Sequence, residues 1–414
     1  MFTLKEILKV VGGSRVTGSA SRLFTGISID TRTIQPGELF IPVKGKRFDG
    51  QKFISIALAK GAAVLEVKDG LKALQALAAY HRGKFKIPVI GVTGSVGKTT
   101  TKDMLAAILA QEMPTLKNEE NFNNEIGAPL TLLRLRKKHK VAVVEMAMQG
   151  LGEIAALAEI VRPTISVVTN IGEAHLEFLK TKKNVARAKS EIFQYQTQKD
   201  FAVINADDEY FEKLRSDVKC QRLNIVTFGI IEKAKVTPGE LKGIKLPIGG
   251  EHNIYNALAA IAAAKILKIK KKSIKQGLEM FRPSSNRYDV INRQDGVKII
   301  NDTYNANPQS MTAMLKVLAW LSGRKIAVLG DMYELGQRAK PAHRQIGKLA
   351  RKLGIDLLIS IGKLAKDMKA DFHFAGKTAA INKLKKIIHP GDRILVKASH
   401  GLHLEEVVEA IRTI

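Results

Sequence analysis

The stretch Ile87-Pro-Val-Ile-Gly-Val-Thr-Gly-Ser-Val-Gly-Lys-Thr-Thr-Thr101 decides the fold of this chain. Its first part, up to Val92, is apolar and rich in β-branched residues, which is typical of a strand buried in a parallel sheet. A loop with Gly94 and Gly97 follows, and a helix is expected directly after the loop. This order of strand, glycine loop and helix predicts an α/β fold with a phosphate-binding loop.

The loop has the residue types that bind the phosphates of a nucleotide. Backbone N–H groups between Gly94 and Gly97 can surround a phosphate, and the dipole of the following helix favours an anion there. In such loops the lysine, here Lys98, reaches the β- and γ-phosphates, and the hydroxyl of Thr99 holds Mg²⁺. The usual pattern has a further glycine five positions before Gly97, where this chain has Val92. The alternative is a turn with a surface lysine, and the flanking strand and helix argue against it.

Strand-like and helix-like segments alternate on the C-terminal side of this loop. Apolar, β-rich runs alternate with helical patterns as follows: strands at 141–145, 165–169 and 201–204, and helices near 152–161, 184–196 and 252–268. This alternation predicts a parallel sheet with helices on both faces. We assign it to a central domain at residues 83–284.

Two further blocks flank the central one. Residues 1–82 begin with an amphipathic helix, continue with short β-type segments and end with alanine-rich helices, which indicates a small α/β domain. Residues 285–414 alternate between strands and helices again, which predicts another α/β domain. The length of 414 residues fits two or three domains.

The composition excludes several classes of protein. Apolar residues make up 45% and charged residues 26%, which is ordinary for a globular chain and argues against disorder. The single cysteine, Cys220, excludes an internal disulfide framework and fits a reducing compartment. No apolar run is long enough to cross a bilayer, and the N-terminus has charges where a signal peptide needs an apolar stretch. We therefore expect a cytoplasmic protein without a membrane span.

The chain is strongly basic, with 67 lysines and arginines against 39 acidic residues and a net charge of +28. Such a charge is typical of proteins that bind nucleic acid, an anionic membrane surface or anionic small substrates. The positive residues are spread along the whole chain, without an aromatic RNA-binding signature, zinc-finger spacing or a basic region joined to heptads. We therefore expect anionic substrates and no specific nucleic-acid partner.

Polar residues at the ends of the central strands are candidates for a site. Glu145 ends the strand at 141–145, where a carboxylate can coordinate Mg²⁺ beside the phosphate loop. His175 follows the next strand: a lone histidine is usually structural, and its place at a strand end of the same sheet strengthens the case for a role in the site. The amide-rich segment Asn121–Gly127 either caps a helix or orients a polar ligand, and the sequence leaves both open. From the residues alone, Lys189 is an exposed lysine on a helix.

Two loops of the block 285–414 also lie at the ends of predicted strands. The segments 302–308 and 329–335 each follow a predicted strand, so both lie at the carboxyl edge of their sheet, where ligands bind in open α/β folds. Pro308 fits the first turn of a helix. We therefore expect a functional role for both loops.

These strings together resemble the Mur ligase family, the ATP-dependent amide ligases that build the peptidoglycan precursor. The resemblance extends over nearly the whole chain and includes the phosphate loop and these strings: Asp30-Thr-Arg32, Pro36-Gly-Glu-Leu-Phe40, Gly45–Gly50, Asn121–Gly127, Asn170-Ile-Gly-Glu-Ala-His-Leu-Glu177, Ala188-Lys-Ser-Glu-Ile-Phe193, His252–Leu258, Tyr304-Asn-Ala-Asn-Pro-Gln-Ser-Met311 and Leu329-Gly-Asp-Met-Tyr-Glu-Leu-Gly336. Asn121–Asn124 and Tyr304–Pro308 favour the branch that adds D-alanyl-D-alanine to UDP-N-acetylmuramoyl-tripeptide.

The resemblance implies three domains with separate tasks. The N-terminal domain is expected to bind the UDP group, the central P-loop-type domain with its parallel sheet to bind ATP, and the Rossmann-like C-terminal domain to close over the nucleotide. It also implies a catalytic set of Lys98, Glu145, His175 and Lys189. Thr99, Glu145, His175 and a carbamylated Lys189 are the implied ligands of Mg²⁺.

The resemblance further implies which residues contact the ligands. The implied ATP-binding residues are Gly94, Ser95, Val96, Gly97, Lys98, Thr99, Thr100, Asn253, Arg287 and Asp302. The implied residues for the UDP-sugar peptide and the dipeptide are Asp30, Thr31, Arg32, Gly45, Phe48, Asp49, Asn123, Asn124, Tyr304, Asn305 and Asn307. A monomer is expected.

The implied reaction activates a carboxylate with ATP. Transfer of the γ-phosphoryl group gives an acyl phosphate, the amine of D-alanyl-D-alanine attacks it, and an amide and inorganic phosphate result. Charge develops on phosphoryl oxygens, so Mg²⁺, Lys98 and helix N-termini are expected to supply most of the stabilisation.

Two positions depart from the family pattern. Ala147 stands where a glycine is usual, and His400 stands in the loop 398–401 where an arginine is usual. A histidine supplies a positive charge there only when it is protonated.

Three other functions remain as alternatives to this interpretation. The first is a related ligase that adds a different amine, including a folylpolyglutamate synthetase-like enzyme. The second, of another class, is a basic P-loop ATPase that binds nucleic acid. The third is an inactive scaffold, which the complete set of phosphate-loop and metal-site residues argues against.

Overall fold

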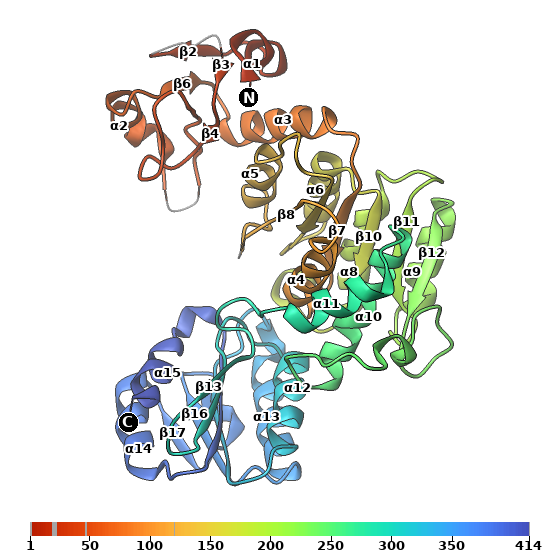
Figure 1. Cartoon of the computed structure of the whole chain (residues 1–414). Helices are drawn as coiled ribbons and strands as arrows, with labels where there is room; N and C mark the ends of the chain where they lie inside the picture. The colour runs from red at the N-terminus through yellow and green to blue at the C-terminus, as the bar shows by residue number, and fades with distance from the viewer. Residues whose placement is uncertain (1, 19–22, 46–47, 120, 414) are drawn as a thin grey trace.

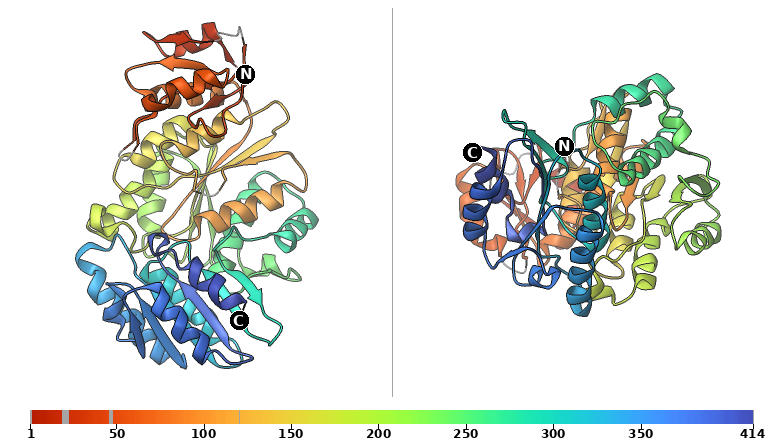
Figure 2. Two further views of the ribbon diagram at one scale, coloured as in Figure 1. Left: turned by 90° about the vertical axis from the view of Figure 1, so that its left-hand side faces the viewer. Right: turned by 90° about the horizontal axis from the view of Figure 1, so that it is seen from below.

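The chain folds around sheets that follow one another along the molecule. The computed structural model describes residues 2–18, 23–45, 48–119 and 121–413. The N-terminal elements lie at one end, the central sheet in the middle and the C-terminal sheet at the other end, in both side views (Figures 1 and 2). Lys46 and Arg47, inside the string Gly45–Gly50, lie outside the described residues.

The central sheet has six parallel strands in the order β12-β11-β10-β7-β9-β8. Their bounds are β7 (Val89–Thr93), β8 (Thr115–Lys117), β9 (Val141–Glu145), β10 (Ile165–Val168), β11 (Phe201–Asn205) and β12 (Asn224–Phe228). Every residue of β7, β9 and β10 is buried, because helices cover both faces of the sheet. The predicted strands and their parallel arrangement are confirmed, whereas β8 and β12 were missed.

Two separate cores fill the faces of the central sheet. One face is covered by α4 (Lys98–Leu109), α10 (Glu251–Ile266) and α11 (Lys271–Met280), and the other by α6 (Glu153–Val161), α8 (Lys182–Ser190) and α9 (Phe211–Cys220). Alternate residues of β7 point to opposite cores, since Ile90 packs in the first and Val89 in the second. The sheet therefore has the doubly wound arrangement that the alternating pattern predicts.

The N-terminal region is a small α/β unit. Its four-stranded sheet has the order β2-β6-β5-β4, and β1 pairs with β3. The elements are β1 (Phe2–Thr3), α1 (Leu4–Val10), β2 (Arg15–Thr17), β3 (Leu23–Phe24), β4 (Ile27–Ser28), β5 (Leu39–Phe40), α2 (Ile54–Ala59), β6 (Ala63–Glu66) and α3 (Gly70–Gly83). Leu74 and Leu77 of α3 share one core with Leu132 of α5 (Gly127–Leu133), so the N-terminal unit is packed against the central one.

The C-terminal region is a second doubly wound unit. Its six-stranded sheet has the order β13-β14-β18-β15-β16-β17, in which only β13 is antiparallel among the described strands. The strands are β13 (Asp289–Asn292), β14 (Lys298–Asp302), β15 (Lys325–Gly330), β16 (Leu357–Ile361), β17 (Phe372–Phe374) and β18 (Arg393–Lys397). The helices are α12 (Pro308–Ala319), α13 (Ala339–Lys352), α14 (Lys377–Ile387) and α15 (Glu405–Arg412). The predicted fold class is confirmed, whereas the domain bounds at 82/83 and 284/285 stay a prediction.

The carboxyl edges of the central and C-terminal sheets face each other. The segment after β10, which includes α7 (Leu176–Leu179), contacts the segment after β15: Arg338 forms an ion pair of 2.7 Å with Glu173, and Glu177 N donates to Glu334 O at 3.1 Å. This is the edge where open α/β sheets bind ligands. No helix of the described residues is long and apolar enough to span a membrane.

Candidate nucleotide and metal site

The phosphate loop between β7 and α4 needs glycine at two positions. Gly97 has φ +85°, and a Cβ added there would lie 2.1 Å from Asn256 Oδ1. Gly94 has φ +151°, and a Cβ there would lie 1.8 Å from Thr169 Oγ1. Both the backbone conformation and the close neighbours therefore exclude side chains at these two positions.

The loop after β10 braces the phosphate loop. Asn170 accepts a hydrogen bond from Val96 N at 3.0 Å and donates one to Val96 O at 2.8 Å, while Thr169 Oγ1 donates to the same carbonyl at 2.6 Å. Ser95 N donates to Asn170 O at 3.0 Å. Thr169 and Asn170 were not among the predicted site residues. Their position at the end of a central strand was the signal that could have identified them.

Lys98 is the first residue of α4 and lies along the loop that precedes it. Its ammonium donates to Gly94 O at 2.9 Å and to Ser95 O at 3.5 Å. Burial lowers the pKa of Lys98, while the negative charges of Glu145 and Glu334 raise it. Lys98 therefore lies among the charged groups of the site, on the helix turn that also carries Thr99 and Thr100.

Glu145 is a buried carboxylate at the end of β9, with 1% of its surface exposed. Its Oε1 accepts a hydrogen bond of 2.8 Å from Asn123 Nδ2. Among the described residues, its Oε2 has no hydrogen-bond partner, and the closest ion pair is with Lys102 Nζ at 4.0 Å. A buried carboxylate oxygen without a partner is costly, so a ligand at this oxygen would stabilise the arrangement.

Lys189 lies on α8 and is also buried, with 1% of its surface exposed. Burial lowers the pKa of Lys189 well below its ordinary value, and the positive charge of Lys98 lowers it further. The interpretation from the residues alone, an exposed helix lysine, is wrong, because the folded chain buries this face of α8.

His175 precedes α7 and has the left-handed conformation with φ +55°. Its Nδ1 lies 2.5 Å from Glu334 Oε2, in the segment after β15 of the C-terminal sheet. Burial lowers the pKa of His175, which keeps the imidazole neutral and able to bind a metal ion. Glu334 lies in the loop 329–335, for which the sequence predicts a functional role, but it was not named as a site residue, because its partner His175 lies far away in the sequence.

A cavity of about 260 Å³ adjoins the phosphate loop. Its lining combines mostly polar residues of the central region with two residues of α12: Val96, Asn170, Ile171, Asn205, Asp207, Asp208, Glu209, His252, Tyr255, Asn256, Gln309 and Ala313. Asn253 is buried next to this lining, where its Nδ2 donates to Gly249 O at 2.7 Å and its Oδ1 accepts from Asn256 Nδ2 at 3.0 Å. Its side chain therefore positions Asn256 in this structure.

The C-terminal candidates form a cluster beside β14. The guanidinium of Arg287 lies 3.8 Å from the centre of the Tyr304 ring. Asp302 pairs with the buried Lys397 at 2.5 Å, and Lys397 also donates to Asn305 O at 2.7 Å. Lys397 was missed, because a lysine at the end of an apolar run gives no signal of its buried partner.

Three of the predicted asparagines differ in what their side chains do. Asn123 orients Glu145, as described above, whereas Asn124 accepts from Gly127 N at 2.9 Å and from Ile126 N at 3.2 Å at the start of α5. Asn307 caps α12 by accepting from Ser310 N at 2.8 Å. The sequence left open whether the segment 121–127 caps a helix or orients a polar group. In the structure it does both, since Asn124 caps α5 and Asn123 orients the carboxylate of Glu145.

The predicted UDP-binding residues lie apart from this site, in the N-terminal unit (Figure 1). Arg32 forms an ion pair of 2.6 Å with Asp30, and Lys60 Nζ donates to Thr31 O at 2.7 Å. In a second group, Gly45 N donates to Phe48 O at 2.8 Å, and Asp49 caps the helical turn that follows it. The structure groups each of these sets locally and does not bring them to the phosphate loop.

Comparisons with known proteins agree with this architecture. Three domains of one family match the chain: the Mur ligase family catalytic domain at residues 23–111, the Mur ligase middle domain at 92–264 and the Mur ligase glutamate ligase domain at 286–400. The UDP-N-acetylmuramoyl-tripeptide–D-alanyl-D-alanine ligase of Bacillus subtilis strain 168 is 36% identical, over 98% of this chain and 97% of its own length. The ligase of that name from Escherichia coli K12 is 35% identical, over 99% and 98%.

Solved structures give the same result. MurF from Acinetobacter baumannii superposes with a TM-score of 0.91 and 30% identity, over 100% of this chain and 99% of the relative. The MurF ligase of Thermotoga maritima, solved in complex with ADP, has a TM-score of 0.83 and 28% identity, over 94% and 97%.

The fold and the site together define a P-loop-type α/β ligase, an ATP-dependent enzyme that forms amide bonds. The chain belongs to the Mur ligase family. The predicted family and the predicted class of enzyme are therefore confirmed. The names of the relatives favour the branch that acts on D-alanyl-D-alanine over the alternative functions.

Proposed function

We propose that this protein joins D-alanyl-D-alanine to UDP-N-acetylmuramoyl-tripeptide and hydrolyses ATP to ADP and phosphate in doing so. The observation that carries the proposal is the convergence of Lys98, Glu145, His175 and Lys189 at one sheet edge, facing the C-terminal unit. The choice of substrates rests on the relatives named UDP-N-acetylmuramoyl-tripeptide–D-alanyl-D-alanine ligase, which match this chain over nearly its full length.

ATP is proposed to bind with its phosphates in the loop Gly94–Thr100. The glycines there bring backbone N–H groups close to the phosphates, and the N-terminus of α4 adds a favourable dipole. The ammonium of Lys98 can exchange its contacts with the loop carbonyls for contacts with the β- and γ-phosphates. Asn253, Arg287 and Asp302 are the proposed contacts for the remainder of the nucleotide.

The residues at this edge fit Mg²⁺. The unpartnered Oε2 of Glu145 and the hydroxyl of the buried Thr99 are oxygen ligands of the kind that Mg²⁺ prefers, and His175 offers a neutral imidazole. When bound, Mg²⁺ neutralises charge on the phosphoryl oxygens. The structure therefore supports a divalent-metal site formed by Thr99, Glu145, His175 and Lys189.

Lys189 is proposed to act as a carbamate. Its burial favours the neutral amine, which is the form that reacts with CO₂. The nitrogen lone pair attacks the carbon of CO₂ and one proton leaves, so the neutral amine becomes a carboxylate-like anion. That change removes the repulsion between Lys189 and Lys98 and supplies an oxygen ligand for the metal.

The reaction then proceeds in two transfers. A carboxylate oxygen of the tripeptide attacks the γ-phosphorus, ADP leaves, and an acyl phosphate forms. The amine of D-alanyl-D-alanine attacks the acyl carbon, and the tetrahedral intermediate releases phosphate and a proton as the amide forms. Lys98 and the loop amides stabilise the charge that develops on the phosphoryl oxygens. Closure of the two facing sheet edges excludes water that would hydrolyse the acyl phosphate.

The other parts of the chain have proposed tasks as well. Residues 1–82 are proposed to hold the UDP group through Asp30, Thr31, Arg32, Gly45, Phe48 and Asp49. Residues 83–284 are proposed as the ATP-binding domain and 285–414 as the closing domain. Asn123, Asn124, Tyr304, Asn305 and Asn307 are proposed to contact the peptide substrates. We propose that the enzyme acts as a monomer in the cytoplasm, where reactions that use ATP take place.

The test is ADP formation with ATP, UDP-N-acetylmuramoyl-tripeptide and D-alanyl-D-alanine, each omitted in turn. The proposal requires that ADP form steadily only with all three present, and that the UDP product gain the mass of the dipeptide less water. Glycine, glutamate and lysine as single amines test the related ligases. Steady turnover with one of them and none with the dipeptide would reject the proposed substrate. ATP hydrolysis stimulated only by generic RNA or DNA would support the nucleic-acid alternative.

A further inference from the structure

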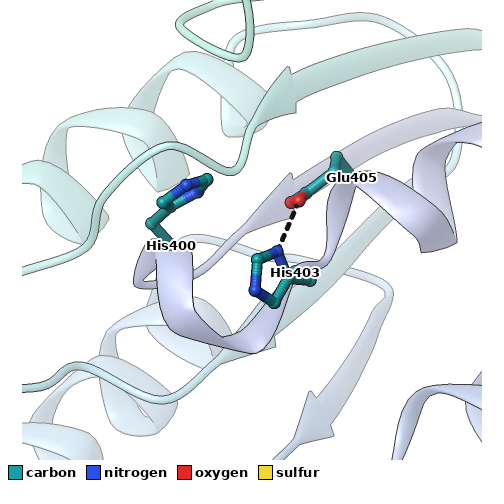
Figure 3. A group of neighbouring side chains, drawn as sticks. All are labelled: His400, His403 and Glu405. Carbon is teal, nitrogen blue, oxygen red and sulfur yellow. Dashed lines mark hydrogen bonds and ion pairs between the residues drawn. The ribbon is translucent and has the colours of Figure 1, made fainter. Parts of the chain in front are cut away.

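The loop between β18 and α15 brings together two histidines and a glutamate outside the nucleotide site. His400 begins a short 3₁₀ turn (His400–Leu402), His403 follows the turn with φ +52°, and Glu405 is the first residue of α15. Figure 3 shows the imidazole of His403 beside the carboxylate of Glu405, and that of His400 on the other side of the turn. One ligand atom from each residue lies within 4.8 Å of the other two.

Glu405 carries an independent sign that this cluster is incomplete. Its Oε1 is 2.9 Å from His403 Nδ1, but among the described residues its buried Oε2 has no hydrogen-bond partner. Buried carboxylate oxygens are almost always paired, because losing water without gaining a partner costs free energy. The N-terminus of α15 favours the ionised carboxylate at this position. A metal ion beside Oε2 would accept an electron pair from this oxygen and so give it a partner.

We propose that His400, His403 and Glu405 bind one divalent transition-metal ion of the zinc type. Two imidazole nitrogens and one carboxylate oxygen form a typical ligand set for zinc, whereas Mg²⁺ and Ca²⁺ prefer oxygen alone. Bonds of about 2.1 Å in a tetrahedral site place the ligand atoms roughly 3.4 Å apart, so the cluster must contract. His400 and His403 are exposed, and their side chains can rotate to allow this contraction.

The surroundings select for the class of ion. The ring of His400 is stacked on that of Tyr304, with centroids 5.6 Å apart and planes 18° apart, and Tyr304 in turn lies under the guanidinium of Arg287. This nearby positive charge opposes a cation that is held by charge alone. The same charge is a smaller obstacle to an ion that forms strong bonds to imidazole. Zinc, cobalt and nickel are therefore favoured over Mg²⁺.

The experiment measures Co²⁺ binding to the full chain by its visible absorption, with Zn²⁺ as the competitor. The parent and all variants carry His175→Gln and are measured in a large excess of Mg²⁺, so that Co²⁺ does not bind at the nucleotide site. We expect one saturable Co²⁺ per chain, displaced by Zn²⁺. His400→Gln, His403→Gln and Glu405→Gln should each weaken binding by about tenfold or more, as loss of a metal contact does.

The matched control is His373→Gln, which removes an exposed histidine from β17 and should leave binding unchanged. Circular dichroism and thermal unfolding establish that each variant is folded, and His400→Gln, at an exposed position, keeps the test interpretable if Glu405→Gln is unstable. Equal Co²⁺ affinity in the parent and all three variants would overturn the proposal. So would the absence of saturable binding in the folded parent.

Discussion

His175 and Glu334 lie 2.5 Å apart, Nδ1 to Oε2, although they follow strands of different sheets. Both have a positive φ, +55° and +62°, a conformation that costs about 1–3 kcal/mol in residues other than glycine. Glu334 also accepts hydrogen bonds from Gln149 Nε2 at 3.3 Å and, through its backbone carbonyl, from Glu177 N at 3.1 Å. The surrounding contacts thus hold two strained residues together at the boundary where the proposed metal site meets the C-terminal unit.

Replacement of Glu334 should therefore weaken the metal dependence of the reaction. A carboxylate that fixes the orientation of a ligating imidazole typically contributes 10–100-fold to metal affinity or activity. We expect Glu334→Ala to raise the Mg²⁺ concentration needed for half-maximal ADP formation about tenfold, and Glu334→Gln, which keeps an acceptor oxygen, to raise it less. The measurement is a Mg²⁺ titration at saturating substrates.

Arg338→Met is the control for this prediction. It removes the ion pair with Glu173 across the same boundary, but that pair is partly exposed and contributes about 0–1 kcal/mol. The Mg²⁺ titration of Arg338→Met should overlay that of the parent. If Glu334→Ala gave the same titration as Arg338→Met, Glu334 would not orient His175 in the active enzyme.

Gly97 offers a test that separates close contact from backbone strain. Gly97 and Gly152 both have φ +85°, but a Cβ would lie 2.1 Å from Asn256 Oδ1 at Gly97 and would meet nothing within 4 Å at Gly152. Gly152→Ala should cost only the strain of about 1 kcal/mol and keep activity near that of the parent. Gly97→Ala should in addition displace Asn256 and lower ATP turnover by about a hundredfold or more. Equal losses of activity in the two variants would mean that backbone strain alone explains why position 97 needs glycine.

Much of this site follows from position in the sequence, and the remainder depends on packing. Glu145 was identifiable because it ends an apolar strand next to a phosphate loop, and parallel strands end at a shared edge. The burial of Lys189 could not be predicted in this way, because the residues of α8 alone do not show which side of the helix faces the interior. The bond between His175 and Glu334 joins residues 159 positions apart, so only the meeting of two sheets creates it.

The same distinction explains the elements that were missed. Strand β8 has three residues and β12 is only half-buried, so neither has the continuous apolar run that identified β7, β9 and β10. The role of Asn124 was undecidable for a related reason, since a capping side chain and a ligand-binding one use the same residue types.

Removal of the Lys98 ammonium should abolish ligation. Lys98 is the cation of the phosphate loop, and the loss of one preorganised group at the developing charge costs about a hundred- to a thousandfold in turnover. We expect Lys98→Ala to give no ADP above background, with thermal unfolding close to that of the parent. Lys180→Ala, at an exposed lysine, is the control. Near-parental phosphate release by Lys98→Ala would contradict the proposed mechanism.

Lys189 should be replaceable in part by a small carboxylic acid. Lys189→Ala leaves a cavity and removes the proposed carbamate, so turnover should fall severely in plain buffer. Formate or acetate can bring a carboxylate into that cavity and should restore part of the activity, in proportion to its concentration. Lys183→Ala, on the same helix, should neither lose activity nor respond to acetate. Full activity of Lys189→Ala without added acid would exclude a role for the carbamate.

Glu6 gives the N-terminal unit a defined dependence on pH. The ammonium of Lys84 lies 2.6 Å from Oε1 and, with hydrogen bonds from Thr3 and Tyr80, lowers the pKa of Glu6 from 4.5 to about 2. Because the folded pKa is the lower one, the stabilisation is complete above about pH 4.5 and disappears as the pH falls toward 2.

Glu6→Gln should therefore lower the unfolding temperature at pH 7 and lose its effect in acid. The carboxylate is partly exposed, so we expect a loss of about 1 kcal/mol at neutral pH. The measurement is thermal unfolding of parent and variant from pH 7 to pH 3, in which the difference should shrink below pH 4.5, where the unfolded carboxyl begins to titrate. Glu66→Gln, at an exposed position in the same unit, is the control and should show no such trend. A difference that stayed constant over this range would show that the charge of Glu6 contributes nothing, because only the charged form makes the contact with Lys84.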